Sequence, residues 1–210
     1  VFPYDPRMAD YLKATERSEI ADLADRHCDL LAPDPEVLED PDRYFDVLVE
    51  IDLTHLEPYV VGPHTPDLAR PVSSLAEDAH NNDYPCNLTS ALIGSCTNSS
   101  YEDMSRAADV ARQASAHGGK ASTQIWVTPG SEQIHQTIQR DGQMADLEAI
   151  GGVVLANACG PCIGQWKRDD IQSGDRNSIM SSYNRNFPKR NDGNPETLSF
   201  IASPEITIAY

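Results

Sequence analysis

Apolar residues at helical spacing predict two short helices in residues 1–31. Asp5 and Pro6 favour a helix start, because aspartate can cap the first turn and proline already has the backbone angle of a first helical position. Two apolar stripes follow: Met8, Tyr11 and Leu12, then Ile20, Leu23, Ala24 and Leu31. Cys28 lies within the second stripe and is expected to be a small core residue.

The pattern changes twice before residue 89. Residues 44–51 (Tyr-Phe-Asp-Val-Leu-Val-Glu-Ile) are rich in strand-forming residues and predict a strand. The prolines from Pro58 to Pro71 predict a loop without regular structure, because proline lacks the backbone donor that helices and strands need. His55 and His64 fall in this region without partners at metal-binding spacing, so we expect neither to be functional.

From residue 89 onward, short apolar runs alternate with amphipathic stretches. The runs predict strands at 91–93, 124–127, 153–155 and 178–180. Between them, one helix is expected from a Ser100–Asp103 capping box to Gly118, and another from Ser131 to Ile150 with a break at Gly142. Such alternation is typical of an α/β fold with a parallel sheet flanked by helices. We therefore expect an α/β domain at 89–210, preceded at 1–88 by lead-in helices, one strand and a proline-rich loop that belong to a neighbouring part of the parent fold.

Polar segments follow each predicted strand at the point where it ends. They are Ser95–Cys96, Thr128–Gly130, Cys159–Cys162 and Asn184–Arg185. Ligands of parallel sheets bind beyond the carboxyl ends of the strands. The sequence therefore predicts a site at that edge.

Composition excludes several classes of partner. The 210 residues carry a formal net charge of −17, which repels phosphate backbones and anionic lipid, so we expect no nucleic-acid or membrane partner. No apolar run approaches the roughly 18 residues of a membrane span. Five cysteines, an odd number, do not suggest a secreted disulfide framework. The chain starts at Val1 and is expected to be a piece of a longer protein.

The thiols of Cys96, Cys159 and Cys162 allow three interpretations. The Cys159–Cys162 tetrapeptide, Cys-Gly-Pro-Cys, is also that of a thioredoxin-type redox dithiol, but such a module has no need of Cys96. A structural zinc site would want a fourth ligand, and no histidine lies near these cysteines in sequence. Three thiolates suit an iron–sulfur cluster with one iron left open, which can act as a Lewis acid. Arg185 and Arg190 would then supply bidentate clamps for an anionic substrate.

Four segments together resemble one enzyme family. They are Leu92-Ile93-Gly94-Ser95-Cys96-Thr97-Asn98-Ser99, Thr128-Pro129-Gly130-Ser131, Ala156-Asn157-Ala158-Cys159-Gly160-Pro161-Cys162 and Ser182-Tyr183-Asn184-Arg185-Asn186-Phe187. This set is similar to that of the aconitases (aconitate hydratases) of the mitochondrial type. The similarity extends over nearly the whole chain and is strongest from about Leu92 to Thr197.

The resemblance implies a cofactor, a substrate class and a reaction. By resemblance, Cys96, Cys159 and Cys162 hold a [4Fe-4S] cluster, Arg185 and Arg190 bind substrate carboxylates, and Asn184 lies beside the cluster. The family isomerises a tricarboxylate, citrate to isocitrate through cis-aconitate, in the tricarboxylic acid cycle of the mitochondrial matrix, and a complete chain is expected to be monomeric.

The resemblance also implies what this chain lacks. The family's serine base and its further substrate residues belong to segments outside Val1–Tyr210, in the missing domains of the parent chain. We therefore expect no catalytic base here and no turnover by the isolated chain.

Two segments depart from the usual family pattern. Lys167 stands where an acidic residue is common, and Pro188-Lys189 replaces a small, flexible pair before Arg190. These departures leave a homocitrate/homoaconitate hydratase of lysine biosynthesis as an alternative.

Overall fold

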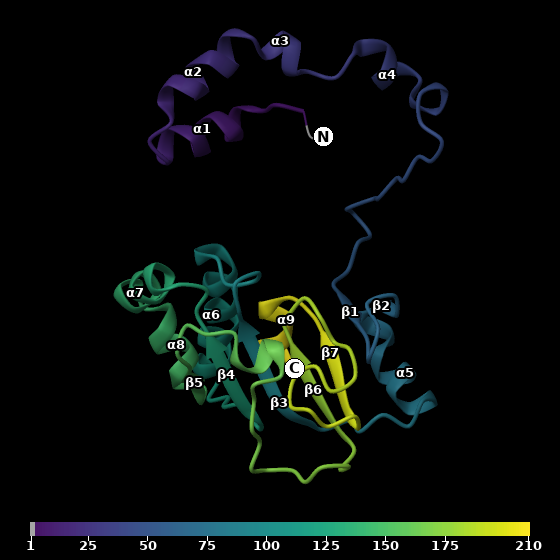
Figure 1. Cartoon of the computed structure of the whole chain (residues 1–210), viewed down its shortest axis with the longest axis vertical. Coiled ribbons are helices and arrows are strands. Elements are labelled where there is room, and N and C mark those ends of the chain that lie inside the picture. Colours follow the sequence, from purple (N-terminus) through teal and green to yellow (C-terminus); the bar gives the residue numbers. More distant parts are fainter. Residues whose placement is uncertain (1–2) are drawn as a thin grey trace. The chain divides into compact units, whose positions relative to one another are not determined.

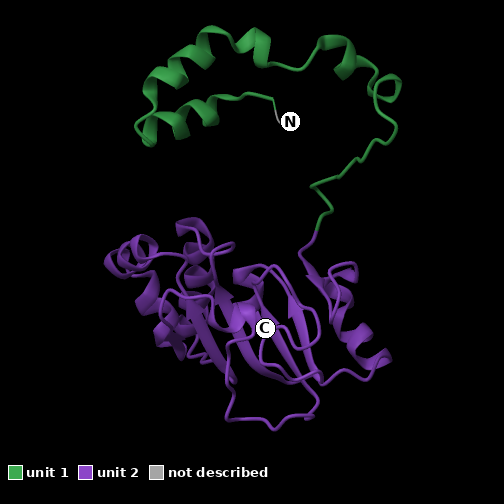
Figure 2. Ribbon diagram, viewed as in Figure 1, with its two compact units in different colours: residues 1–56 green, residues 57–210 purple. Residues whose placement is uncertain are grey.

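The computed structural model describes residues 3–210. These residues divide into two compact units, one ending at Leu56 and the other spanning Glu57–Tyr210 (Figure 2). The expected division after residue 88 differs from this one. Residues 59–71 supply two strands to the sheet of the second unit, so the second unit begins before them.

The first unit is helical. It contains α1 (Pro6–Ala14), α2 (Ser18–Arg26), α3 (Cys28–Leu31), α4 (Pro35–Glu39) and the 3-10 helix η1 (Pro41–Arg43). Asp5 caps α1 as expected, accepting backbone hydrogen bonds from Arg7 at 2.7 Å and Met8 at 3.2 Å.

Two expectations for the first unit are wrong. The strand expected at 44–51 is absent, and these residues form turns and irregular backbone with exposed side chains. Strand-forming residues hold a strand only where a neighbouring strand offers hydrogen bonds, and none of the sheet strands pairs with this segment. Cys28 is exposed rather than a core residue.

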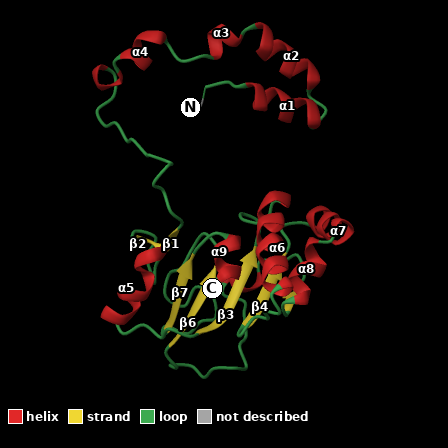
Figure 3. Ribbon diagram, turned by 180° about the vertical axis from the view of Figure 1, so that it is seen from behind, coloured by secondary structure: helices red, strands yellow, loops and turns green. Residues whose placement is uncertain are grey.

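The second unit is built on a seven-stranded sheet with the order β2-β1-β7-β6-β3-β4-β5 (Figures 1 and 3). The strands β3 (Leu88–Gly94), β4 (Gln124–Thr128), β5 (Gly152–Val154), β6 (Asn177–Ser181) and β7 (Thr197–Ile201) are mutually parallel. At one edge β1 (Tyr59–Val61) pairs antiparallel with both β7 and β2 (Ala69–Pro71).

The expected irregular loop at Pro58–Pro71 therefore contains two short strands. Val60 of β1 is fully buried, and Arg70 of β2 pairs with Val60 across the hairpin. Pro58 precedes β1, Pro71 ends β2, and the remaining prolines lie between the two strands. The prolines of this stretch thus limit the length of the strands without preventing their formation.

The helices of the second unit are α5 (Leu75–Asn81), α6 (Tyr101–Ala116), α7 (Glu132–Asp141), α8 (Gln143–Ala149) and α9 (Pro204–Ala209), with 3-10 turns η2 (Val72–Ser74) and η3 (Gly160–Ile163). The Ser100–Asp103 capping box starts α6, and Gly142, with a φ of 94°, separates α7 from α8, both as expected. The sequence did not reveal α5, β7 or α9. Within residues 3–210, no helix combines the length and apolarity that crossing a bilayer requires.

Alternating residues of the strands face two different cores. On the side of the helices, Ala91 and Ile93 of β3 pack with Met104 of α6, Ile138 of α7 and Leu147 of α8. The intervening residue Leu92 faces the other side of the sheet, where it packs with Ile179 and Tyr183. Trp126, Cys162 and Trp166 cover that second cluster. The expected α/β fold with a mainly parallel sheet is confirmed.

Candidate functional site

The loops that carry the candidate chemistry all leave the same edge of the sheet. Because β3, β4, β5 and β6 are parallel, their carboxyl ends lie together, and the four polar segments expected to converge follow these four ends. The four polar segments therefore lie at one edge of the sheet, as expected from the order of the strands in the sequence.

The turn after β3 is built around Gly94. Its φ is 104°, and a side chain at this position would collide with the backbone carbonyl of Thr128, at the end of β4. Ser95 continues with a φ of 82°, and its backbone N–H donates to that same Thr128 carbonyl at 3.0 Å. The buried Ser99 hydroxyl donates back to the Ser95 carbonyl. This fixed turn leaves Cys96 exposed beyond the sheet.

The turn after β3 is tied to the one after β6 through Ser182. The Ser182 hydroxyl accepts a hydrogen bond from the Gly94 N–H at 3.0 Å, and the Ser182 N–H donates to Leu92 at 2.9 Å. The Asn98 side-chain amide donates to the Ser182 carbonyl. Asn184 and Arg185, two and three residues further on, are exposed at the same edge.

The Cys159–Cys162 segment forms a single 3-10 turn, η3, closed by Gly164 with a φ of 82°. Cys159 is exposed, whereas Cys162 is half-buried against the cluster of Leu92, Ile179 and Tyr183. Trp166 packs on the same cluster and meets Trp126 edge to face, with ring centroids 6.4 Å apart. The second cysteine of the pair is therefore anchored to the sheet.

The thiol of Cys162 is affected by burial and by charged neighbours. The pKa of the Cys162 thiol is raised, chiefly by burial, and the Arg190 guanidinium opposes this shift. Cys96 and Cys159 also raise this pKa, which places both within electrostatic range of Cys162 although they reach the site from different loops. Arg190 is partly buried, and its Nε has no hydrogen-bond partner among the described residues.

The residues at this edge, three cysteines and a partly buried arginine, are of the types that bind an iron–sulfur cluster and an anion. Within residues 3–210, no group of three His, Cys, Asp or Glu side chains is close enough to hold one metal ion. The unpartnered Arg190 Nε beside the thiols is a donor for an anionic ligand.

The other residues that the sequence singled out lie outside this site or make no contact that suggests a function. Cys86 is exposed in the loop before β3, and His55 is exposed in the first unit. His64 is half-buried, and burial lowers its pKa against an opposing effect of Glu196. Lys167, Pro188 and Lys189 are exposed.

Sequence reasoning missed the side chains that fix the two loops after β5 and β6. Arg168 and Asp192, both 2% exposed, form a buried ion pair at 3.4 Å, and Arg168 stacks over the Trp166 ring at 4.8 Å. The Asn191 amide donates to the Pro161 carbonyl at 3.2 Å. The available signal was an arginine six residues after Cys162 and an aspartate directly following Arg190–Asn191, but local sequence does not show that these two side chains pair.

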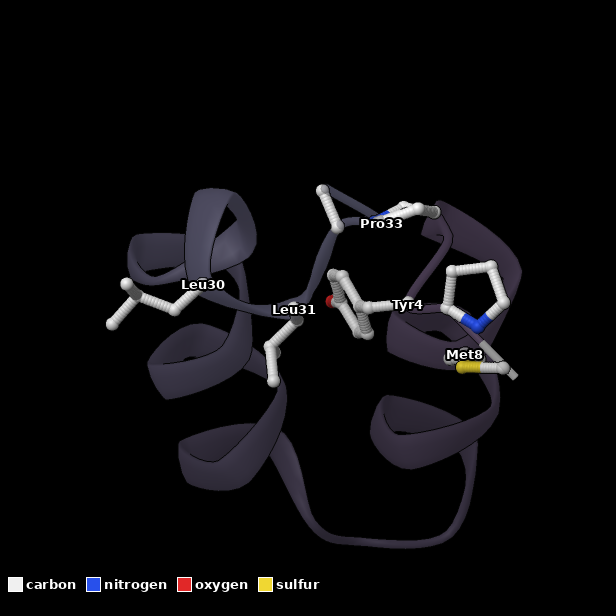
Figure 4. Close-up of a pocket in the computed structure, with 7 residues that line it drawn as sticks. Tyr4, Met8, Leu30, Leu31 and Pro33 are labelled. Atoms are coloured by element: carbon white, nitrogen blue, oxygen red, sulfur yellow. The ribbon is translucent and has the colours of Figure 1, made fainter. Parts of the chain in front are cut away.

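A separate cavity of about 510 Å³ lies in the first unit (Figure 4). Its lining is largely apolar, from Pro3, Tyr4, Met8, Leu30, Leu31, Ala32 and Pro33. The Tyr4 hydroxyl donates to Asp25 at 2.6 Å, and this hydrogen bond raises the pKa of Tyr4 to about 12. The cavity contains none of the cysteines or arginines described above.

Comparison with known proteins identifies the family. The family model of the aconitases (aconitate hydratases) matches residues 1–210. The whole chain is 57% identical to the mitochondrial aconitate hydratase of Saccharomyces cerevisiae and 56% identical to that of Aspergillus fumigatus. It is 55% identical to a probable mitochondrial aconitate hydratase of Dictyostelium discoideum. The chain spans only 26% of the length of each of these relatives. By the match along its full length, the chain belongs to the aconitase family.

Proposed function

We propose that this chain carries the cluster ligands and part of the substrate site of an aconitate hydratase that interconverts citrate and isocitrate through cis-aconitate. The observation that carries the proposal is that the loops bearing Cys96, Cys159 and Cys162 leave the same edge of the parallel sheet, and that the Cys159–Cys162 turn is hydrogen-bonded to the segment bearing the partly buried Arg190. The family membership and the names of the relatives support the same reaction. The relatives named above are all mitochondrial, which supports the mitochondrial matrix as the location.

Cys96, Cys159 and Cys162 would hold a [4Fe-4S] cluster as thiolates. When bound, the cluster supplies an iron without a protein thiolate, a Lewis acid for a substrate hydroxyl and carboxylate. Arg190 would bind a carboxylate in bidentate fashion beside Cys162, and Arg185 would contact another carboxylate from the exposed loop after β6. Asn184 would lie beside the cluster and orient the substrate through its amide.

The geometry disfavours the redox dithiol. A thioredoxin-type cysteine lies at the N-terminus of a long helix that lowers its pKa, whereas Cys159 precedes only the four-residue turn η3. Cys96 also lies nearby, which a dithiol does not require.

The homocitrate alternative finds no support in the comparisons, since the relatives named above are all aconitate hydratases. We therefore favour a tricarboxylate of the citrate type as the substrate. The remaining partners would be the other domains of a family-length chain, which supply the base. The complete enzyme would be monomeric and would not bind nucleic acid or membrane, and residues 1–210 alone would show no turnover.

The test is anaerobic reconstitution of the complete protein with iron and sulfide, followed by iron counting and visible absorption. The parent protein should bind about four irons per chain. Cys96→Ser should lose most of this iron and absorption. Cys86→Ser is the matched control, because it removes an equally exposed thiol from the loop before β3, and it should behave like the parent. Iron binding that survives Cys96→Ser unchanged, together with dithiol oxidoreductase activity, would overturn the proposal.

A further inference from the structure

The loop after β5 and the loop after β6 are held together by buried contacts. The side chains that make these contacts are not candidate ligands of the cluster or of the substrate. One loop carries Cys159 and Cys162, and the other carries Arg190. The side-chain amide of Asn191, 2% exposed, donates to the carbonyl of Pro161, inside the cysteine turn, at 3.2 Å. Asn191 directly follows Arg190, so this bond fixes the arginine's backbone to the turn.

Gly164 provides a second contact between the same two loops. A Cβ on Gly164 would lie 3.1 Å from the backbone carbonyl of Arg190, which is tighter than ordinary van der Waals contact. The two backbones therefore lie close together just after the cysteine turn, and a side chain at Gly164 would both strain the φ of 82° and push against the Arg190 carbonyl.

The Arg168–Asp192 ion pair joins the same two loops at a point further along each of them. Arg168 also donates to Asn177 at 2.9 Å, at the start of β6, and Asp192 accepts from Thr197 at 2.7 Å, at the start of β7. Each loop is thus fixed to a strand as well as to the other loop. A buried, fully paired arrangement of this kind resists local displacement.

We propose that Asn191 and Gly164 are positioning residues that hold the cysteine turn and the substrate arginine as one rigid body. The consequence for substrate binding rests on the proposed function: if Cys162 is a cluster ligand and Arg190 a carboxylate ligand, their separation sets the distance between the open iron and the substrate's carboxylate. Placement errors of about 1 Å cost enzymes on the order of 100-fold in rate. Neither Asn191 nor Gly164 contacts substrate in this proposal; both act through their neighbours.

The first test needs neither cluster nor activity. In the complete, cluster-free protein, the rate at which iodoacetamide alkylates Cys162 is measured by peptide mass spectrometry. Asn191→Ala should raise that rate several-fold, because the half-buried thiol is released with its turn, whereas the alkylation of exposed Cys96 should not change. The control is Asn194→Ala, which also removes a buried amide donor between the same two loops, bound to the Asp175 carbonyl at 2.8 Å, but has no hydrogen bond to the cysteine turn.

A second pair of variants keeps the proposal testable if Asn191→Ala does not fold. Gly164→Ala should also raise Cys162 alkylation, since its methyl group pushes the Arg190 carbonyl away. Gly174→Ala is its match: Gly174 has a φ of 96° in the same β5–β6 connection, but a Cβ there meets nothing within 4 Å. Backbone strain alone predicts equal effects of the two glycine variants, and the inter-loop contact predicts an effect of Gly164→Ala only.

In the reconstituted enzyme, Asn191→Ala should raise the KM for citrate at least tenfold while keeping the parent's iron content. Unchanged alkylation of Cys162 in both Asn191→Ala and Gly164→Ala would overturn the inference, even in an active aconitate hydratase. If the protein instead binds no cluster, the proposed function fails, but the alkylation result still decides whether the loops form one body.

Discussion

The buried ion pair between Arg168 and Asp192 offers a sharp test of what holds the site loops in place. Arg168 contacts two aspartates that differ in exposure: the side chain of Asp192 is 2% exposed, and that of Asp170 is 52% exposed. Replacing either aspartate with alanine removes one negative charge from the same guanidinium. Any difference between the two variants therefore reports the burial and the hydrogen bonds of the Asp192 carboxylate and not the number of charges.

The expected losses of stability differ severalfold. Removing one partner of a buried pair costs about 3–5 kcal/mol where the remaining charge is left uncompensated, but Arg168 keeps Asp170 as a second partner. Asp192→Ala also deprives Thr197 and the Asn194 N–H of their acceptor, at 2.7 and 3.0 Å, so we expect a loss of about 3 kcal/mol, at the lower end of that range. An exposed pair contributes about 0–1 kcal/mol, so Asp170→Ala should cost little. For a unit of this size the loss in Asp192→Ala corresponds to a fall of about 6–12 °C in Tm.

Thermal unfolding followed by near-ultraviolet circular dichroism is the assay of choice. Trp166 lies under Arg168 and against Trp126, so loss of the pair should also reduce the aromatic signal before global unfolding. Asp192→Asn is an informative control, because it keeps the size and the acceptor for Thr197 while removing the charge, and it should fall between the other two variants. Equal Tm values for Asp192→Ala and Asp170→Ala would refute the assignment of the stabilisation to the buried pair.

Three further predictions concern the sheet and its loops. Ser100→Ala removes the side chain that caps α6 and should cost about 0.5–2 kcal/mol in urea unfolding, whereas Ser100→Asp should restore most of it. Gly94→Ala places a methyl group against the Thr128 carbonyl and should destabilise the protein by more than the roughly 1 kcal/mol typical of a point substitution; a smaller loss would contradict the close approach. Because burial lowers the pKa of His64, the unfolded chain binds its proton first, so stability should fall as the pH drops below about 6.5; His64→Gln should flatten this dependence, and an unchanged pH profile would exclude His64 as its source.

The sequence predicted the elements whose signals are local. The capping box at Ser100 and the left-handed Gly142 each mark a helix boundary within a few residues, and both boundaries lie where expected. The four apolar runs from Ala91 to Met180 predicted four parallel strands, and strand polarity alone then placed Cys96 and Cys159 at one edge.

The elements that it missed depend on distant partners. The strand β7 mixes Thr197 and Ser199 with apolar residues, and its polar side chains are buried only because neighbouring strands surround them. Residues 44–51 show the converse, since their strand-forming side chains have no strand to pair with. The partners Arg168 and Asp192 lie in two different loops, and nothing within either loop indicates which opposite charge would meet which.

The order in which the thiols occur along the chain has a consequence for biosynthesis. Cys159 and Cys162 lie in one turn, but Cys96 joins them only after β3, β4 and β5 have paired in parallel through two helical crossovers. Non-local pairing of this kind forms slowly, because loop closure must precede its gains. An unfolded or nascent chain can therefore offer iron at most two neighbouring thiols. Two thiols bind the iron weakly and leave the bound iron open to oxidation. If Cys96, Cys159 and Cys162 hold a cluster as proposed, its insertion should follow folding of the sheet, and iron delivered after refolding should yield more intact cluster than iron present throughout it.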